Sequence, residues 1–413
     1  MQRKLFRDAK VLSLRTGRYA QEMDVLVENG TIAAIGRNLE CADAEVVECE
    51  GRYMTPSLID AHVHMICEEM GLQCIVCGVT AVRHLSGGEG VLRYARDIRA
   101  GRRAGPYIYS SGPIVDGAGA RYKSPSHVYI DGPEQAAQAV RDTVEAGYLW
   151  AKAYPSMTPE EMESFLQEAK RLNIRVSGHL SYYADPKALA DLGYACCEHS
   201  SSLPKNDEDI DYLADSGMWF CPTQLVCETL PDYVWKEKPL SEAAGYEYLS
   251  EASRKYWEER NKKIIAEYKE RNLKPDINVI IARGRRFMDR SDRYMAGSDA
   301  MYPGVVAGFG LHAELRKLVD LYGLAPLDAL RAATMKPAEC MGLSACKGQI
   351  APGMDADLLL LERDPLEDIS NLLSIHMVIQ GERVYGRRQL DRMLDELKDP
   401  RREFEVFEPT FLF

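Results

Sequence analysis

Short apolar runs alternate with amphipathic helical patterns through the middle of the chain. Eight such runs end in polar residues, namely YMTPSLIDAHVH, GVTAVRHLSG, GPYIYSSGP, YLWAKAYPS, IRVSGHLS, YACCEHSSS, MWFCPTQLV and RYMAGSDA. Between them lie stretches of helical periodicity such as PEQAAQAVRDTVEAG and TPEEMESFLQEAKRLN. Strands that alternate with helices predict a parallel sheet, and eight such units predict a (β/α)8 barrel of the TIM type. We therefore expect an α/β fold.

The two ends of the chain carry a different pattern. DVLVENG and TIAAIG are short β-rich runs joined at Asn29-Gly30, a dipeptide that favours a hairpin turn, and DADLLLLERD and IHMVIQGERVYG repeat this pattern near the other end. Both ends together could build one small β-sandwich. The expected division is a small β-sandwich domain from 1–53 and 347–390, a barrel over 54–346, and a C-terminal helix and tail over 391–413.

One insertion, from about Pro239 to Asp289, is highly charged and mostly helical in pattern. It could cap the barrel mouth, although a charge run of this kind more often marks a solvated helix face. The tail EFEVFEPTFLF is aromatic and apolar. It could dock on its own barrel or on a neighbouring subunit, so a homo-oligomer remains open.

Composition narrows the possible partners and the compartment. The 413 residues include 63 acids and 51 bases, for a formal charge of −12, which argues against a nucleic-acid partner. No apolar window of about 18 residues predicts a membrane span, and the N-terminus lacks the apolar run of a signal peptide. The eleven cysteines are scattered, and the C-x-x-C pair Cys74 and Cys77 has no second pair at zinc-finger distance. We expect reduced cysteines packed as small hydrophobes in a cytoplasmic protein.

Polar residues that could carry chemistry fall at the predicted strand ends, where barrel enzymes place their active sites. His62 and His64 stand two residues apart on a strand, so both imidazoles point to one side and could share a divalent ion. His179, His199 and Asp299 end three further strands. Singly, each could be a satisfied polar residue, and Asp299 could be a turn or N-cap residue. Together they predict a metal site.

Lys152 stands in the otherwise apolar run LWAKAY. Burial of an ammonium group is costly and lowers its pKa. The neutral amine can react with carbon dioxide to form a carbamate, whose two oxygens could bridge a pair of cations. The alternatives are a lysine that reaches the surface along its alkyl chain or forms a buried ion pair.

These motifs occur in the order seen in the amidohydrolase superfamily. The resemblance rests on PSLIDAHVH, the strand lysine, GHLSY, CEHS and AGSDA, followed by GLHAELRKLVDLYGLAPLDALRAATMKPAECMGL and KGQIAPGMDADLLLLERDPLEDI. It extends from about Asp24 to Tyr385. Within the superfamily, the chain most resembles the prolidase-like branch of Xaa-Pro dipeptidases and related carboxypeptidases with a carboxylated lysine.

The resemblance implies a binuclear metal centre with N6-carboxylated Lys152 as the bridge. It assigns His62, His64 and Asp299 to the more buried ion, and His179 and His199 to the second. Zinc is the usual ion in such relatives, while Mn, Co and Fe stay open. The implied reaction is cleavage of a C–N amide bond by a metal-bridging hydroxide. Asp299 would act as general base and then as general acid toward the leaving amine.

Substrate recognition is where the chain departs from the prolidase-like pattern. Tyr182 stands three residues after His179, where such relatives use a tyrosine to bind the substrate carboxylate and deaminases use a glutamate; the adjacent Tyr183 is a second candidate. The usual Gly-Gly-His-Gly loop is replaced by Ser111-Gly112-Pro113-Ile114. The missing positive charge could come from one of three residues further along the chain, His127, Arg121 or Lys123.

Three further positions bear on the site. His84 stands where relatives often have aspartate. His312 and Glu314, in GFGLHAEL, are expected to support the loop after the last barrel strand, with an exposed helix surface as the alternative.

The expected substrate is a small N-acyl amino acid or dipeptide with a free carboxylate. The alternative is a cyclic amide or lactone, such as a xenobiotic ring. A catalytically inactive binding protein is a third hypothesis, and it predicts missing metal ligands, none of which is missing here.

Overall fold

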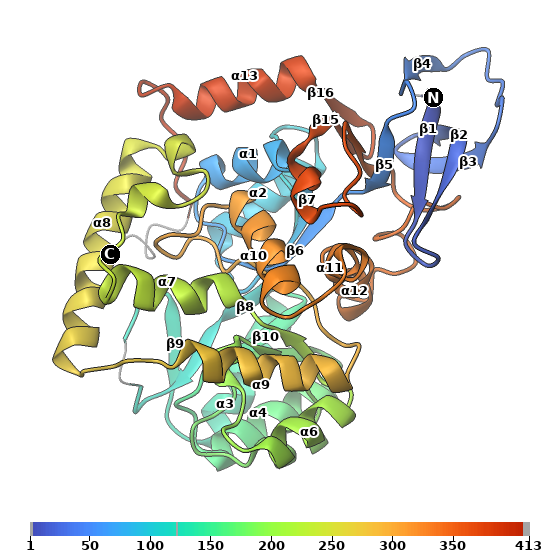
Figure 1. The fold of residues 1–413 in the computed structure, drawn as a ribbon. Coiled ribbons are helices and arrows are strands. Elements are labelled where there is room, and N and C mark those ends of the chain that lie inside the picture. The colour runs from blue at the N-terminus through green and yellow to red at the C-terminus, as the bar shows by residue number, and fades with distance from the viewer. Residues whose placement is uncertain (1–2, 121–122, 408–413) are drawn as a thin grey trace.

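The computed structural model describes residues 3–120 and 123–407, and it contains a parallel barrel beside a separate sheet (Figure 1). The barrel strands follow one another in space as they do in sequence, apart from β9 (His127–Ile130), which pairs with β8 outside the main path. They are β6 (Leu58–Val63), β7 (Val79–His84), β8 (Tyr107–Gly117), β10 (Trp150–Ala153), β11 (Arg175–Gly178), β12 (Tyr194–Glu198) and β13 (Trp219–Cys221). Every residue of β6 and β7 is buried, as expected for parallel strands that are covered on both faces.

The eighth predicted run, RYMAGSDA, closes the barrel without forming a regular strand. Met295 N donates to Phe220 O at 2.9 Å on one side, and Ala61 N donates to Ala296 O at 3.0 Å on the other. A Cβ atom on Gly297 would lie 2.8 Å from the backbone nitrogen of His62, so only glycine permits this close approach. All eight predicted strand positions are therefore present, and the TIM-like barrel is confirmed.

Helices follow the barrel strands, as the alternating pattern predicts. They are α1 (Glu68–Val76), α2 (Glu89–Arg99), α3 (Pro133–Glu145), α4 (Pro159–Arg171), α5 (Pro186–Asp191), α6 (Asp207–Asp215), α7 (Gln224–Val234), α8 (Glu251–Glu270), α9 (Ile277–Arg290), α10 (Phe309–Asp320), α11 (Pro326–Ala332), α12 (Met335–Cys340) and α13 (Arg387–Lys398), with 3-10 turns η1 (Ser200–Ser202), η2 (Leu240–Glu242), η3 (Tyr246–Tyr248) and η4 (Ile369–Leu373). The Thr158 side chain caps α4 through a reciprocal capping box with Glu161, which explains the sharp start of that helix.

The second sheet draws its strands from both ends of the chain. Its order is β16-β15-β14-β5-β1-β2-β3, with β4 paired to β1. The strands are β1 (Arg3–Ser13), β2 (Arg18–Glu28), β3 (Thr31–Gly36), β4 (Glu45–Glu48), β5 (Tyr53–Pro56), β14 (Asp357–Leu361), β15 (Ile375–Gln380) and β16 (Arg383–Gly386). Asn29 and Gly30 both have positive φ angles and join β2 to β3, which confirms the hairpin predicted from that dipeptide.

The C-terminal segment packs on its own barrel. Helix α13 contacts α1, and Phe407 N donates to Ile66 O at 3.0 Å. The Phe407 ring stacks on Tyr94 with centroids 4.6 Å apart. Of the two docking alternatives for the tail, the described residues show the intramolecular one, while 408–413 lie outside the described part of the chain.

Two observations concern the environment of the protein. Across residues 3–120 and 123–407, no helix combines the length and apolar character that crossing a bilayer requires. All eleven cysteines are free thiols, and nine of them are buried.

Candidate metal centre and active site

The structure brings the six predicted ligand residues together at the carboxyl ends of the barrel strands. His62 lies in β6, His64 follows it, and Lys152 lies in β10. The other three stand directly after β11, after β12 and in the closing segment, at His179, His199 and Asp299. The cluster therefore gathers side chains from positions up to 237 residues apart (299 − 62).

Asp299 is the centre of the first group. Its Oδ1 atom lies 3.0 Å from His64 Nε2 and 3.4 Å from His62 Nε2, and His62, His64 and Asp299 hold their donor atoms within 4.8 Å of one another. Two imidazole nitrogens and a carboxylate oxygen are a donor set that suits zinc and related divalent ions.

The remaining histidines form the second group. The His179 and His199 rings are 4.4 Å apart between centroids, and the His199 ring is 4.8 Å from that of His62. His199 Nδ1 lies 2.7 Å from Thr223 Oγ1 and 3.8 Å from Asp299 Oδ2. Asp299 thus lies between the two histidine groups.

Lys152 is buried at 1% exposure, and its Nζ atom has no hydrogen-bond partner among the described residues. Burial lowers its pKa, and the acidic groups Glu198 and Asp299 only partly oppose this effect. Neither alternative for this residue fits, because the amine neither reaches the surface nor forms an ion pair within 4 Å in the described part of the chain. Burial thus favours the neutral form of the amine, which is the form that carbon dioxide can modify.

A buried ion pair contacts His62 on the Nδ1 side of its ring. His62 Nδ1 lies 2.8 Å from Glu198 Oε2, and Arg83 Nη2 donates to Glu198 Oε1 at 2.6 Å. All three side chains have no exposed surface. The sequence analysis missed Glu198 and Arg83, although both carry the signal that singled out Lys152, a charged residue inside an apolar strand.

The supporting contacts of His62 and His64 engage Nδ1 and so set the direction of Nε2, the ring atom that a metal would need to reach. Nδ1 of His62 is occupied by Glu198 and Nδ1 of His64 by Ser86 Oγ at 2.8 Å, which turns both Nε2 atoms toward Asp299. In the described structure, His62 Nε2, His179 Nδ1 and Lys152 Nζ are buried without a partner. Burial also lowers the pKa of His179 to about 3 and the pKa values of His62 and His199 well below their ordinary value, which keeps these imidazoles neutral. The donor atoms of His62, His64 and Asp299 therefore fit a divalent ion.

The backbone at three of these strand ends is strained. His199, Thr223 and Asp299 have φ angles of 71°, 41° and 58°, which side-chain-bearing residues seldom adopt. Such conformations persist where surrounding contacts enforce them, as they often do at functional sites. Here the contacts include the Asp299 N to His62 O bond of 2.7 Å.

The comparisons with known proteins identify the family. The amidohydrolase family profile matches residues 53–384, about four-fifths of the chain. The chain belongs to the amidohydrolase family. The matched range contains all six clustered residues and the Arg83–Glu198 pair.

Individual relatives of this amidohydrolase are distant hydrolases. Ochratoxinase of Aspergillus niger is 26% identical over 332 residues, which span 71% of this chain and 62% of that protein, so the match leaves over a third of ochratoxinase uncovered. Imidazolonepropionase of Acinetobacter baumannii (strain AB307-0294) is 24% identical over 86% of this chain and 92% of that protein. A Xaa-Pro dipeptidase structure with bound methionine in the active site shares the fold at a TM-score of 0.75 and 19% identity, over 93% of this chain and all of that one.

The remaining predicted residues of the amidohydrolase site are those expected to bind the substrate. Tyr182 is 73% exposed and Tyr183 59% exposed, while Arg121 lies outside the described residues. His127 is half-buried, with its ring 5.0 Å from the Tyr154 ring, which is in turn 4.5 Å from His179. Sequence analysis did not single out Tyr154, although it directly follows the strand that carries Lys152.

His312 and Glu314 are both buried, so the alternative of an exposed helix surface is wrong. The structure places them beside other elements than the expected loop. His312 Nε2 lies 2.8 Å from Cys77 O, and the two Glu314 oxygens accept from Gln224 N and Leu225 N at 2.8 and 2.7 Å. Glu314 thus supports the start of α7, directly after Thr223.

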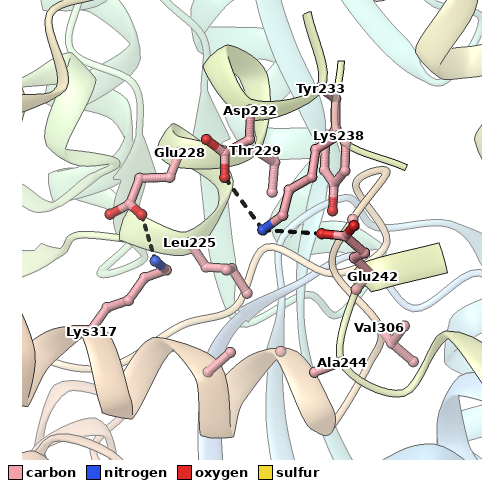
Figure 2. A pocket seen from close by; sticks show the side chains of 14 residues that line it. Leu225, Glu228, Thr229, Asp232, Tyr233, Lys238, Glu242, Ala244, Val306 and Lys317 are labelled. Carbon is pink, nitrogen blue, oxygen red and sulfur yellow. Dashed lines mark hydrogen bonds and ion pairs between the residues drawn. The ribbon is translucent and has the colours of Figure 1, made fainter. Parts of the chain in front are cut away.

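A small cavity of about 120 Å³ lies between α7, α10 and the segment that precedes α8. Figure 2 shows that its cations are already paired, with Lys238 between Asp232 and Glu242 and Lys317 beside Glu228. None of the six clustered residues lines this cavity. It is therefore separate from the candidate centre.

Proposed function

We propose that this amidohydrolase uses two divalent metal ions to cleave the C–N amide bond of a small substrate, an N-acyl amino acid or a dipeptide with a free carboxylate. The observation that carries the proposal is the position of Asp299, a carboxylate held against His62 and His64 and close to a buried amine that has no partner. His62, His64 and Asp299 would hold one ion, His179 and His199 the second, and carboxylated Lys152 would bridge them. Zinc suits these ligands best.

When bound, the ions would lower the pKa of water toward neutrality and polarise the scissile carbonyl. Asp299 would accept a proton from the attacking water and pass it to the leaving amine. Its Oδ2 faces His199 while Oδ1 faces His64, so one carboxylate can serve both sides of the centre. Glu198 and Arg83 would hold His62 in the tautomer whose Nε2 carries the lone pair.

The proposed substrate class depends on the residues expected at the mouth of the barrel. Tyr182 stands after His179 at the edge of the site, and its hydroxyl would bind the substrate carboxylate together with His127 or Arg121. A Tyr182→Phe variant with unchanged activity would count against a carboxylate-bearing substrate bound in this way.

A cyclic amide or lactone is the second candidate substrate. The observation that favours it is the imidazolonepropionase match, which covers most of both chains and whose name specifies an imidazolone. A ring-opening hydrolase needs the same centre and does not need a cation at the mouth.

We also propose a cytoplasmic location, because all cysteines are unpaired thiols, as is usual in reducing compartments. Self-association is a further proposal, tested by the molar mass in solution.

The decisive experiment is a screen of the purified protein against N-acyl amino acids, dipeptides and cyclic amides, with elemental analysis of the same sample. The proposal expects close to two divalent ions per chain and hydrolysis of at least one linear carboxylate-bearing class. Turnover of ring substrates alone would favour the second candidate. Turnover that persists after exhaustive chelation would contradict metal-dependent chemistry.

A further inference from the structure

The C-terminal end of the described chain pairs with the stretch that directly follows His64. An antiparallel bridge joins Val406 to Cys67, three residues after this candidate ligand. On one side of the bridge, Phe407 N donates to Ile66 O at 3.0 Å. Because the pairing is antiparallel, the chain approaches His64 as it runs toward Phe407.

Residues 405–407 form this C-terminal strand, and Glu405 fixes its other end. The Glu405 carbonyl accepts from Glu68 N at 2.9 Å. Its side chain lies 3.1 Å from Arg93 Nη2 and 2.5 Å from Arg103 Nη2, and both arginines belong to α2 or the loop that follows it. The strand is therefore held by its backbone and by charge before it reaches Phe407.

Phe407 also packs on α2. Its side chain is buried, and its ring stacks on Tyr94 with centroids 4.6 Å apart. Gly90, in the first turn of α2, lies so close that a Cβ atom there would stand 2.0 Å from Phe407 O. The loop that leads into α2 carries Ser86, whose Oγ lies 2.8 Å from His64 Nδ1. Phe407 thus joins the stretch after His64 to the helix that follows the hydrogen-bond partner of the same histidine.

The other side of this stretch is held from within the barrel. His64 N donates to Ala300 O at 2.5 Å, and Met65 N donates to His84 Nδ1 at 2.9 Å. With Phe407 on the outside, the chain after β6 is fixed from two sides. Such support matters at a metal site, because each ligand must be held within about 0.5 Å of its working position.

We infer that Phe407 is a positioning residue for His64, so that the first metal site reaches its full affinity only when the C-terminal strand is docked. Phe407 acts through the backbone of Ile66 and through α2, whose preceding loop orients the His64 ring by way of Ser86. The inference rests on the proposed function for the assignment of His64 as a ligand. It gives the aromatic end of the chain a role beyond covering apolar surface.

The test is Zn²⁺ binding to the full-length protein, measured by competition with a chromophoric chelator. Phe407→Ala should weaken one of the two ions by about 10- to 100-fold, the usual effect of losing a partner that orients a ligand, and should affect the other ion less. Gly90→Ala should have the same effect, because the new Cβ displaces Phe407 O. The double variant should be no weaker than Phe407→Ala, since both changes undo one contact.

Each variant has a matched control. Phe404→Ala removes another aromatic ring of the same segment, half-buried and 5.2 Å from the Arg402 guanidinium. Gly386→Ala adds a Cβ atom that meets nothing within 4 Å. Both controls should bind Zn²⁺ as wild type does. Phe407→Leu, which keeps apolar volume, should lose less affinity than Phe407→Ala.

Urea unfolding in excess chelator separates positioning from packing. A role in stability alone would lower the urea midpoint of Phe407→Ala and leave the Zn²⁺ affinity of the folded protein unchanged, and that result would overturn the inference. So would a Gly90→Ala protein that binds both ions as tightly as wild type. Wild-type protein that binds no Zn²⁺ would instead contradict the proposed metal centre, and the inference with it.

Discussion

His62 and Glu198 form a buried hydrogen-bonded pair, with Nδ1 of the imidazole 2.8 Å from Oε2 of the carboxylate. Because the carboxylate only accepts, Nδ1 carries the proton and Nε2 carries the lone pair that faces Asp299. Arg83 balances the carboxylate charge inside the barrel at 2.6 Å. The pair therefore fixes the ring orientation and the tautomer of His62, a candidate metal ligand, from the interior of the barrel.

A Glu198→Gln substitution should therefore lower metal affinity by about 10- to 100-fold, the usual effect of removing a partner that orients a ligand. It should also lower the free energy of unfolding by about 3–5 kcal/mol, because Arg83 is left buried without its counter-charge. Metal titration and urea denaturation measure the two effects. The control, Glu228→Gln, breaks a half-exposed pair with Lys317 and should leave metal binding intact. A Glu198→Met and Arg83→Met double variant should recover stability but not metal affinity; recovery of both would show that the pair has no role in positioning His62.

Replacing Asp299 with asparagine should reduce kcat by about 10²-fold or more while the protein stays folded, because both proton transfer and a ligand charge are lost. Rates with the substrate found in the screen, circular dichroism and metal content check this together. Asp292→Asn, which alters a fully exposed carboxylate nearby in the chain, should behave as wild type. An Asp299→Asn enzyme of normal activity would exclude it as the general base.

A Lys152→Ala variant should contain less metal than wild type and should regain part of its metal and activity when short carboxylates are added in place of the carbamate. In the metal-free state, Lys152→Met should be at least as stable as wild type, because it removes a buried polar atom that has no partner. Elemental analysis and denaturant unfolding provide the two measurements. Full metal content and full rate in Lys152→Ala would refute the bridge.

The stability of the metal-free protein should fall in acid through His84. Met65 N donates to its Nδ1 at 2.9 Å and its Nε2–H donates to Ser86 O at 2.8 Å, so protonation of Nδ1 would break the first bond. Burial lowers the pKa of His84 to about 3, against about 6.5 when unfolded. The unfolded state therefore binds the extra proton, and this contribution is complete above pH 6.5 and is lost as the pH falls toward 3.

The measurement is urea unfolding in excess chelator between pH 8 and pH 4.5. One such proton corresponds to a slope of about 1.4 kcal/mol per pH unit. His84→Asn, whose Oδ1 can accept from Met65 N and cannot titrate, should reduce the slope by up to this amount. The other buried histidines should account for the rest of the pH dependence of the unfolding free energy. An unchanged slope in His84→Asn would show that His84 is not a source of acid sensitivity.

Much of this protein follows from local pattern. Alternating apolar runs and helices predicted the barrel, because a strand buried on both faces must be apolar and a helix that covers it must be amphipathic. The Asn29-Gly30 turn was predictable because few dipeptides accept two positive φ angles. His62, His64, His179, His199, Lys152 and Asp299 could be named as candidates because polar residues at the ends of apolar strands are uncommon.

Other features depend on contacts between residues far apart in the chain, which periodicity does not encode. Arg83 lies in β7 and Glu198 in β12, which stand on opposite sides of the closed barrel, so their pairing across its interior shows only when the strands are placed in space. The position of α8 depends on its hydrogen bonds to Glu69 and on the burial of Trp257, whereas along the chain its charges suggest only a solvated helix. The sequence also could not predict that Phe407 packs on Tyr94, because an apolar tail carries no local signal for the surface that it contacts. Spacing and residue type act over a few positions, whereas these contacts depend on the complete packing of the barrel.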